Sequence, residues 1–269
     1  MKPIVDTAFY CCGARMQDAA QVNPICGDGY AKMFMCDYGL RIFNKFKTET
    51  ISTTSTIVRH RIMDDILRRM LRFQPHLCVI TIGAGFDSRP YRLTGGNWFE
   101  LDEPPLMAYK DALLPTCQCA NPLHRIPIEF CADDLEVKLA AISSGSRGAP
   151  IAIIVEGVFI YLNEDETQKL LDSLTRQFPH LILVCDLVTR KMVNQYGQSL
   201  LALVTGMGAP FQAVDDPESV FLSHGYHIKE TISLLEMSVD LGLNLLPKAF
   251  WNTFFSGEVK GNAVYVWEK

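Results

Sequence analysis

Short apolar runs alternate with amphipathic stretches through the middle of the chain, and this alternation limits the possible folds more than any other feature. Because parallel strands are joined by crossover helices, the pattern predicts an α/β fold with a parallel sheet covered by helices. The expected strands are 77–82, 98–102, 125–130, 151–155 and 181–185. The expected helices are 104–114, 135–143, 163–177 and 217–224. Gly, Asp or Glu stands at the carboxyl end of each strand, which is where ligands of open α/β sheets bind.

The two ends of the chain have different patterns. Residues 1–76 are mostly helical in pattern, with breaks at Gly, Pro and Asn, and we expect them to form a cap. A segment at about 196–216 is expected to be an insertion after the fifth strand. Two later runs, 226–232 and 263–267, are expected to pair as an antiparallel hairpin at the sheet edge. We therefore expect a single domain of 269 residues, with the cap followed by an α/β core over 77–269.

Charge and hydropathy exclude several partners. The chain has 25 Lys and Arg against 30 Asp and Glu, a net charge of −5, with no run of basic residues. We therefore expect no binding to nucleic acid or to an anionic membrane surface. The longest apolar runs are far shorter than the roughly 18 residues of a membrane span. Asp6 interrupts the apolar core of a signal peptide, and the nine cysteines lack a disulfide spacing, so we expect a cytoplasmic protein with reduced thiols.

A glycine turn and a following acid mark the expected cofactor site. Gly83, Ala84 and Gly85 follow the first expected strand, where glycines let the backbone turn and approach a ligand closely. Asp102 ends the next strand about 19 residues later, a spacing at which an acid can bind the ribose hydroxyls of a nucleoside cofactor. This pairing points to a cofactor that contains adenosine. These two features leave an alternative open, in which the glycines only form a turn and the acid is only solvated, with no ligand bound.

The residues after this turn favour S-adenosyl-L-methionine over a dinucleotide. Dinucleotide sites have a third glycine three residues after the second, but Ser88 stands there. Asp87 would repel a pyrophosphate, whereas an acid suits a ligand that carries a sulfonium and an ammonium. Asp134 and Glu156, which follow later strands, add two acids at the same rim. A nicotinamide-dependent oxidoreductase on the same sheet is the less favoured alternative.

Several motifs together resemble the leucine carboxyl methyltransferase family, and in particular a bacterial branch that acts on polyketide carboxylates. They extend over most of the chain: 82–93 (IGAGFDSRPYRL), 100–102 (ELD), 133–135 (DDL), 156–162 (EGVFIYL), and Arg59 and Arg61 before Asp64 and Asp65. The resemblance implies a Rossmann-like class I methyltransferase fold, with a mostly parallel seven-stranded sheet flanked by helices and an N-terminal helical cap. It also implies methyl transfer from S-adenosyl-L-methionine, giving S-adenosyl-L-homocysteine. The implied acceptor is a carboxylate of a small molecule or of a peptide or protein C-terminus.

The resemblance also implies roles for single residues. Arg59 would meet the cofactor carboxylate and Glu156 would lie near its amino group, which suits the charges of both pairs. The other implied cofactor residues are Gly83, Ala84 and Gly85 at the methionine portion, Asp102 at the ribose, and Asp134 with Leu135 at the adenine.

The chemistry of the acceptor side is less constrained. A carboxylate with a pKa near 4 is ionised at pH 7, so neither a general base nor a metal is implied. Tyr161 is expected to line the methyl-transfer site, and Arg15 or Tyr10 from the cap to hold the acceptor. For each of these, a packed aromatic ring or a surface charge is an equally good interpretation. A relative that binds the cofactor without turnover, acting as an interaction protein, is the non-enzyme alternative.

The remaining cysteines and histidines suggest no further site. Cys117, Cys119, His124 and Cys131 can be combined into a zinc site on paper, but their spacing matches no closed zinc pattern. His60 has no acid and nucleophile partner at a recognisable spacing. We therefore expect no metal and assign no role to the histidines.

Overall fold

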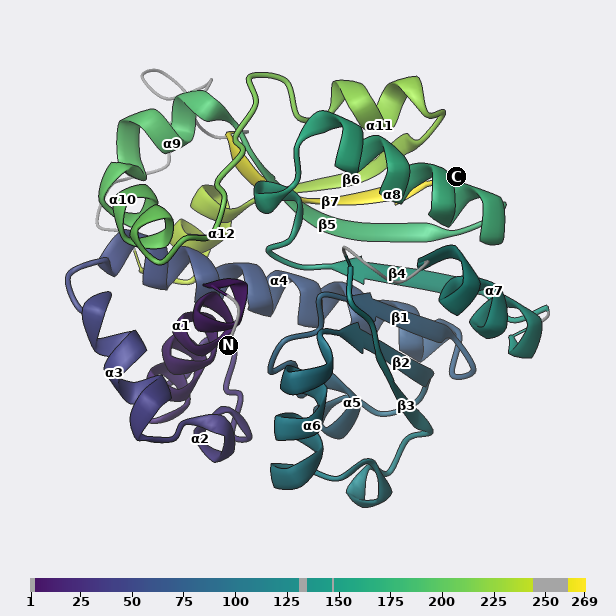
Figure 1. Ribbon diagram of the computed structural model, residues 1–269, viewed down its shortest axis with the longest axis horizontal. Coiled ribbons are helices and arrows are strands. Elements are labelled where there is room, and N and C mark those ends of the chain that lie inside the picture. The colour runs from purple at the N-terminus through teal and green to yellow at the C-terminus, as the bar shows by residue number, and fades with distance from the viewer. Residues whose placement is uncertain (1–2, 131–134, 147, 244–260) are drawn as a thin grey trace.

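The computed structural model describes residues 3–130, 135–146, 148–243 and 261–269, whose strands form one seven-stranded sheet (Figure 1). The strand order is β3-β2-β1-β4-β5-β7-β6. The strands are β1 (Cys78–Ile82), β2 (Asn97–Asp102), β3 (Leu123–Pro127), β4 (Ile151–Val155), β5 (Ile182–Val188), β6 (His227–Ser233) and β7 (Asn262–Glu268). Strands β1 to β5 pair in parallel, and β7 is antiparallel to both β5 and β6. The expected α/β fold with a mostly parallel, seven-stranded sheet is confirmed.

Helices cover both faces of this sheet. The helices are α1 (Pro3–Ala19), α2 (Ala31–Phe34), α3 (Asp37–Lys45), α4 (Thr50–Phe73), α5 (Arg89–Arg92), α6 (Pro104–Leu113), η1 (Thr116–Gln118), α7 (Leu135–Gly145), η2 (Phe159–Tyr161), α8 (Glu164–Gln177), α9 (Arg190–Tyr196), α10 (Gln198–Gly206), α11 (Ser219–Ser223) and α12 (Leu234–Asp240). Residues of α7, α8 and α11 pack on one face, and residues of α4 and α12 on the other. In the central strand β4, Ile153 faces the first layer and Ile154 the second. Because both faces are covered, the strand is an uninterrupted apolar run.

The start of α8 agrees with the sequence analysis. The side chain of Asn163 accepts the N–H of Glu166 at 2.9 Å, and the carboxylate of Glu166 accepts the N–H of Asn163 at 2.8 Å. This capping box satisfies two N–H groups that the helix itself cannot.

Two strand predictions differ from the structure. Strand β3 spans Leu123–Pro127 rather than 125–130, because it ends where its partner β2 ends, with Asp102 opposite Pro127. Strand β5 continues to Val188 beyond its expected end at 185, because β7 pairs with it as far as Val188 opposite Asn262. The two C-terminal runs form the expected antiparallel pair at the sheet edge, with β7 beside β5 and β6 outermost. The reason is composition: 263–267 is apolar throughout and buried, whereas β6 has mostly polar, exposed residues.

The cap lies at the carboxyl ends of the strands, where Figure 1 also shows α9 and α10. A cluster of apolar side chains joins Phe9 of α1 and Phe34 of α2 to Phe86 after β1 and to Val204 of α10. Helix α4, which falls within the expected cap, also packs along the sheet through residues such as Leu67. It therefore connects the cap to the α/β core. Within the described part of the chain, no helix is long and apolar enough to cross a membrane.

Candidate active site

A large cleft lies where the strand order reverses, between β1 and β4. In open α/β sheets, ligands bind at such a switch point, outside the carboxyl ends of the strands. The cleft has a volume of about 1090 Å³ and takes its walls from β1, β2, β5, η2, α1, α4, α9 and α10. It is therefore large enough for a ligand of cofactor size.

The glycine turn closes the end of β1 in the conformation that only glycine adopts easily. Gly83 and Gly85 have φ values of 68° and 49°. A Cβ atom on Gly83 would lie 2.5 Å from Cγ2 of Val158. Ala84, between the two glycines, is buried and also lines the cleft. The turn thus brings backbone to the cleft where a side chain would not fit.

Asp102 is joined to this turn. One carboxylate oxygen, Oδ2, accepts the N–H of Gly85 at 2.6 Å, and Oδ1 accepts the N–H of Glu103 at 2.7 Å. Burial raises the pKa of Asp102, although both N–H groups act in the opposite direction. The structure therefore brings together the turn and the acid that were expected at one cofactor site.

Arg59 lies beside carboxylates from two neighbouring strands. Its Nε donates to Oε1 of Glu156 at 3.2 Å, and its Nη1 donates to Oδ2 of Asp186 at 3.0 Å. The other oxygen of Asp186 accepts the N–H of Gly157 at 2.6 Å. Arg59 and Glu156, expected at the two ends of the methionine portion, are thus in contact. Sequence reasoning gave Asp186 no role, although its place after the fifth apolar run was a usable signal.

Asp87 is paired with an arginine two residues further along the chain. Arg89 donates to it twice, from Nη1 at 3.0 Å and from its own N–H at 2.9 Å. Sequence reasoning considered the charge of Asp87 toward a ligand without a partner, and in the structure the Arg89 guanidinium balances that charge. Arg89 also lies 2.7 Å from Asp64 and 2.8 Å from Glu156. His60, which was given no role, belongs to the same cluster, with Nδ1 3.3 Å from Oε2 of Glu156.

Arg15 ties the cap to the glycine turn. Its Nε donates to Oδ2 of Asp28 at 2.9 Å, and its Nη2 donates to the carbonyl of Phe86 at 2.8 Å. The other oxygen of Asp28 accepts from the Ser88 hydroxyl at 2.6 Å. Burial acts to raise the pKa of Asp28, but Arg15 and Arg92 lower it to about 2. Arg15 was expected to hold the acceptor, but these contacts give its guanidinium a structural position between the cap and the turn.

The part of the cleft between α1, α4, η2 and α9–α10 has mainly hydroxyl-bearing, aliphatic and aromatic walls, and we call it the apolar chamber. It is lined by Thr7, Tyr10, Cys11, Ile51, Ser52, Ser55, Thr56, Tyr161, Met192, Val193, Tyr196, Leu200 and Phe211. Tyr161 is hydrogen-bonded to Thr7, and burial raises its pKa to about 12. Burial also raises the pKa of Tyr10 and of the Cys11 thiol. At pH 7 these three groups are therefore protonated.

The opposite end of the cleft contains a residue that sequence reasoning missed. Phe130, just after β3, is 40% exposed and lines the cleft together with Leu135. An exposed aromatic ring beside an aliphatic side chain can stack on a flat ring system. Its signal in the sequence was its place at the carboxyl end of an expected strand. Asp134, expected next to Leu135, lies outside the described residues.

The side chains considered for zinc have other environments. Cys117 is exposed, whereas the Cys119 thiol donates to the carbonyl of Pro90 at 3.1 Å. His124 stacks on an aromatic ring of β2. Cys131 lies outside the described residues. Among those that the structure describes, no three His, Cys, Asp or Glu side chains are placed to hold a metal ion.

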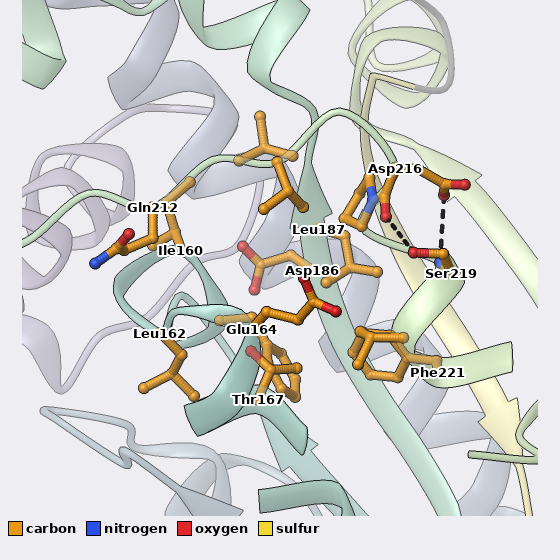
Figure 2. Close-up of a pocket in the computed structure, with 15 residues that line it drawn as sticks. Ile160, Leu162, Glu164, Thr167, Asp186, Leu187, Gln212, Asp216, Ser219 and Phe221 are labelled. Carbon is orange, nitrogen blue, oxygen red and sulfur yellow. Dashed lines mark hydrogen bonds between the residues drawn. The ribbon is translucent and has the colours of Figure 1, made fainter. Parts of the chain in front are cut away.

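A second cavity, drawn in Figure 2, lies behind η2 and has a volume of about 80 Å³. Asp186 stands in the middle of the picture, and Ser219 is hydrogen-bonded to Asp216 at the rim. The N–H of Gln212 donates to the carbonyl of Ile160 at 2.7 Å and holds this segment against η2. The cavity is too small for a substrate. Ile160 and Asp186, which line this cavity, also line the large cleft, so the two cavities share a wall.

The strand order, the glycine turn after β1 and the acid at the end of β2 define a Rossmann-like fold of the class I methyltransferase type. The sequence profile described as leucine carboxyl methyltransferase matches residues 10–175, which is more than half of the chain. The chain therefore belongs to the leucine carboxyl methyltransferase family, as its motifs indicated.

Two known proteins are similar to the chain in sequence, and one solved structure is similar to it in fold. The chain is 30% identical over 158 residues to a Streptomyces coelicolor protein provisionally named an S-adenosyl-L-methionine-dependent methyltransferase. This match covers 55% of the present chain and 50% of that protein. It is 24% identical over 198 residues to TcmP, the tetracenomycin polyketide synthesis O-methyltransferase of Streptomyces glaucescens, covering 72% and 69%. The crystal structure of a DUF574 family protein from Streptomyces avermitilis matches with a TM-score of 0.60 at 14% identity, covering 96% and 97%. The chain spans about half the length of the first of these relatives.

Proposed function

We propose that this protein transfers a methyl group from S-adenosyl-L-methionine to an oxygen atom of a carboxylate, releasing S-adenosyl-L-homocysteine. The observation that carries the proposal is the cleft at the switch point, where the glycine turn, Asp102 and the Arg59–Glu156 pair meet. Membership of the leucine carboxyl methyltransferase family supports the same activity.

The residues of the cleft fit the parts of this cofactor. Asp102 has carboxylate oxygens suited to ribose hydroxyls, and Phe130 with Leu135 offers an apolar surface for the adenine. The backbone at Gly83 leaves room that a Cβ would fill. Arg59 suits the carboxylate of the methionine portion, while Asp134 stays a predicted adenine residue. When bound, the cofactor supplies a methyl group activated by a positively charged sulfur.

The buried charges beside the methionine end also suit this ligand. Among the side chains that are largely shielded from solvent there is one more carboxylate than arginine, with Arg15, Arg59, Arg89 and Arg92 against Asp28, Asp64, Asp87, Glu156 and Asp186. Arg68, which also pairs with Asp64, is 46% exposed and is not counted. S-adenosyl-L-methionine has one net positive charge, whereas a dinucleotide brings negative phosphates. The balance of the whole cluster, rather than Asp87 alone, therefore supports the sulfonium cofactor.

A carboxylate acceptor agrees with the protonation of the chamber. Tyr10, Cys11 and Tyr161 have pKa values above their usual range, so they donate hydrogen bonds rather than take protons. A phenol or alcohol acceptor would need a base, because its oxygen is protonated at pH 7. A carboxylate arrives ionised, so the task of the protein is positioning and exclusion of water.

The chamber walls favour a small apolar acid over a peptide end. Helices α1, α4, α9 and α10 bond most of their backbone groups internally, so they offer few partners to peptide N–H and C=O groups that lose water. The chamber instead offers apolar surface, including Ile51 and Tyr196, which are 60% and 37% exposed. We therefore propose an aromatic or aliphatic small-molecule acid as the acceptor. The similarity to a polyketide O-methyltransferase supports this choice.

Product chemistry tests the proposal. The full chain is incubated with methyl-labelled cofactor and either naphthalene carboxylate or a six-residue peptide that ends in a free leucine carboxylate. Carboxyl methyl esters release labelled methanol in alkali, whereas methyl ethers do not. We expect alkali-labile product from naphthalene carboxylate, and none from Asp102→Ala.

Three results would contradict parts of this proposal. Alkali-stable product from phenols would mean a hydroxyl acceptor, and faster transfer to the peptide would mean a peptide acceptor. Cofactor binding without transfer to any carboxylate would favour the non-catalytic alternative.

A further inference from the structure

His60 projects from α4 into the buried charge cluster beside the cleft, and its side chain is 1% exposed. Its Nδ1 lies 3.3 Å from Oε2 of Glu156 and 2.8 Å from Nη2 of Arg89. Its Nε2 lies 2.7 Å from Nη2 of Arg92 and 3.8 Å from Oδ1 of Asp64. Each ring nitrogen therefore faces one arginine and one carboxylate.

This geometry restricts where the ring proton can be. A neutral imidazole has one donor and one acceptor nitrogen, and arginine only donates. Of the two carboxylates, only Glu156 is within hydrogen-bond distance of a ring nitrogen. Nη2 of Arg89 also faces Nδ1, but its two protons have oxygen acceptors within reach, Oε2 of Glu156 at 2.8 Å and the carbonyl of His60 at 3.2 Å. Arg89 therefore does not need Nδ1 as an acceptor, so the proton belongs on Nδ1, where it points to Glu156, and Nε2 accepts from Arg92. Burial and the charge of Arg89 lower the pKa of His60, which is consistent with a neutral ring.

Glu156 is thereby held by three donors of different charge. Nε of Arg59 lies 3.2 Å from Oε1, and Nη2 of Arg89 lies 2.8 Å from Oε2. His60 adds a third donor without adding a positive charge opposite the site proposed for an ammonium. A cation in its place would repel that ammonium.

We propose that His60 is a positioning residue which, in the Nδ1–H tautomer set by Arg92, aims the Glu156 carboxylate at the amino group of the cofactor. This inference rests on the proposed function. It assigns a task to a histidine that does not itself take part in methyl transfer.

The tautomer can be tested on the unaltered protein. Nitrogen NMR of the full chain labelled at histidine distinguishes the two neutral tautomers and the cation, and the His60 signals are those missing from His60→Asn. We expect a neutral ring with the proton on Nδ1. A proton on Nε2, or a doubly protonated ring at pH 7, would overturn the inference whether or not any variant folds.

The role of His60 in positioning Glu156 is tested by measuring how much the amino group of the ligand contributes to binding. The dissociation constants of S-adenosyl-L-homocysteine and of its analogue without the amino group are measured by calorimetry, and their ratio reports what the amino group contributes. The His60→Asn side chain can place an amide donor near the position of Nδ1, whereas that of His60→Gln reaches the position of Nε2. We expect the ratio to stay within twofold of wild type in His60→Asn and to shrink at least fivefold in His60→Gln. His227→Gln, the same exchange at an exposed site on β6, is the matched control and should change nothing.

The outcomes separate the two proposals. If the wild-type protein does not bind S-adenosyl-L-homocysteine, the proposed function fails and the inference fails with it. If it binds, but the ratio is equal in wild type, His60→Asn and His60→Gln, the proposed function stands and the role of His60 is refuted.

Discussion

At the scale of single residues, Gly83 combines a backbone conformation that favours glycine with a position where a side chain would fill the cleft. Its φ of 68° costs a residue with a side chain roughly 1–2 kcal/mol. A methyl group there would also meet Val158 at 2.5 Å. We expect Gly83→Ala to lower the free energy of urea unfolding by at least about 1 kcal/mol and to weaken S-adenosyl-L-homocysteine binding. Gly145→Ala is the control, since its Cβ would meet nothing within 4 Å, and an equal loss there would contradict this explanation.

Tyr161 is the residue expected to separate turnover from cofactor binding. Its buried hydroxyl is protonated and bonded to Thr7 at the edge of the apolar chamber. A hydrogen bond to a charged acceptor contributes about 1.5–3 kcal/mol, which corresponds to roughly tenfold or more in rate. We expect Tyr161→Phe to lower kcat for carboxyl methylation by this factor. The calorimetric affinity for S-adenosyl-L-homocysteine should not change, and a parallel loss of affinity would place Tyr161 in the cofactor site instead.

Asp28 links acid stability to the contact between cap and glycine turn. Its pKa is about 2 in the folded protein, against roughly 3.9 in an unfolded chain. The folded state therefore binds this proton more weakly, and the resulting stabilisation is present above about pH 4 and disappears as the pH falls towards 2. We expect Asp28→Asn to cost roughly 2 kcal/mol at pH 7, measured by urea unfolding. The difference between variant and wild type should shrink below pH 4, so a constant difference would argue against the charged pair.

Much of the site could be predicted at this scale because it depends on local sequence. Gly83 and Asp102 stand directly after strands, and strands are visible as apolar runs. The partner of His60 could not be predicted, because Glu156 comes from a distant part of the chain and meets His60 only through packing between α4 and the end of β4. The pairing of Asp87 with Arg89 is local, and the arginine two residues further along was a usable signal. A charge seen in the sequence does not identify an opposite charge from a distant segment that the fold places beside it.

At the scale of elements, a strand that is buried on both faces of the sheet was the easiest to predict. Strand β4 is buried on both faces and was predicted with its observed bounds. Strand β3 was misplaced, because its end is set by the register with β2 rather than by its own composition. Helix α4 was assigned to the cap alone, since its amphipathic pattern does not reveal that one end packs on a sheet and the other lines a cleft.

The first turn of α4 gives a prediction about the apolar chamber. Ile51 is 60% exposed there and lines the chamber. Replacing it with aspartate should leave the helix intact, because an acid in the first turn of a helix does not oppose the helix dipole. We expect Ile51→Asp to raise the KM for an apolar carboxylate about tenfold, by repulsion and loss of apolar contact. Leu222→Asp is the matched control, 50% exposed on α11 and outside both cavities. Equal effects of the two variants would contradict the chamber as the acceptor site.

At the scale of the whole molecule, the buried charge cluster connects the cap, the glycine turn and the sheet. Arg15 reaches from α1 to the turn at Phe86, and Arg59 reaches from α4 to the ends of β4 and β5. Buried pairs of this kind are costly to break because one partner is then left unpaired in a dry interior. The cleft is therefore formed by parts of the chain that hold one another in place through charge.

The central claim is that this cleft binds S-adenosyl-L-methionine, and calorimetric titration with S-adenosyl-L-homocysteine tests it most directly. We expect one-to-one binding with a micromolar dissociation constant in the wild-type protein, large weakening in Asp102→Ala, and no heat from NADH. Absence of binding, binding that Asp102→Ala leaves unchanged, or binding of NADH in its place would contradict the claim.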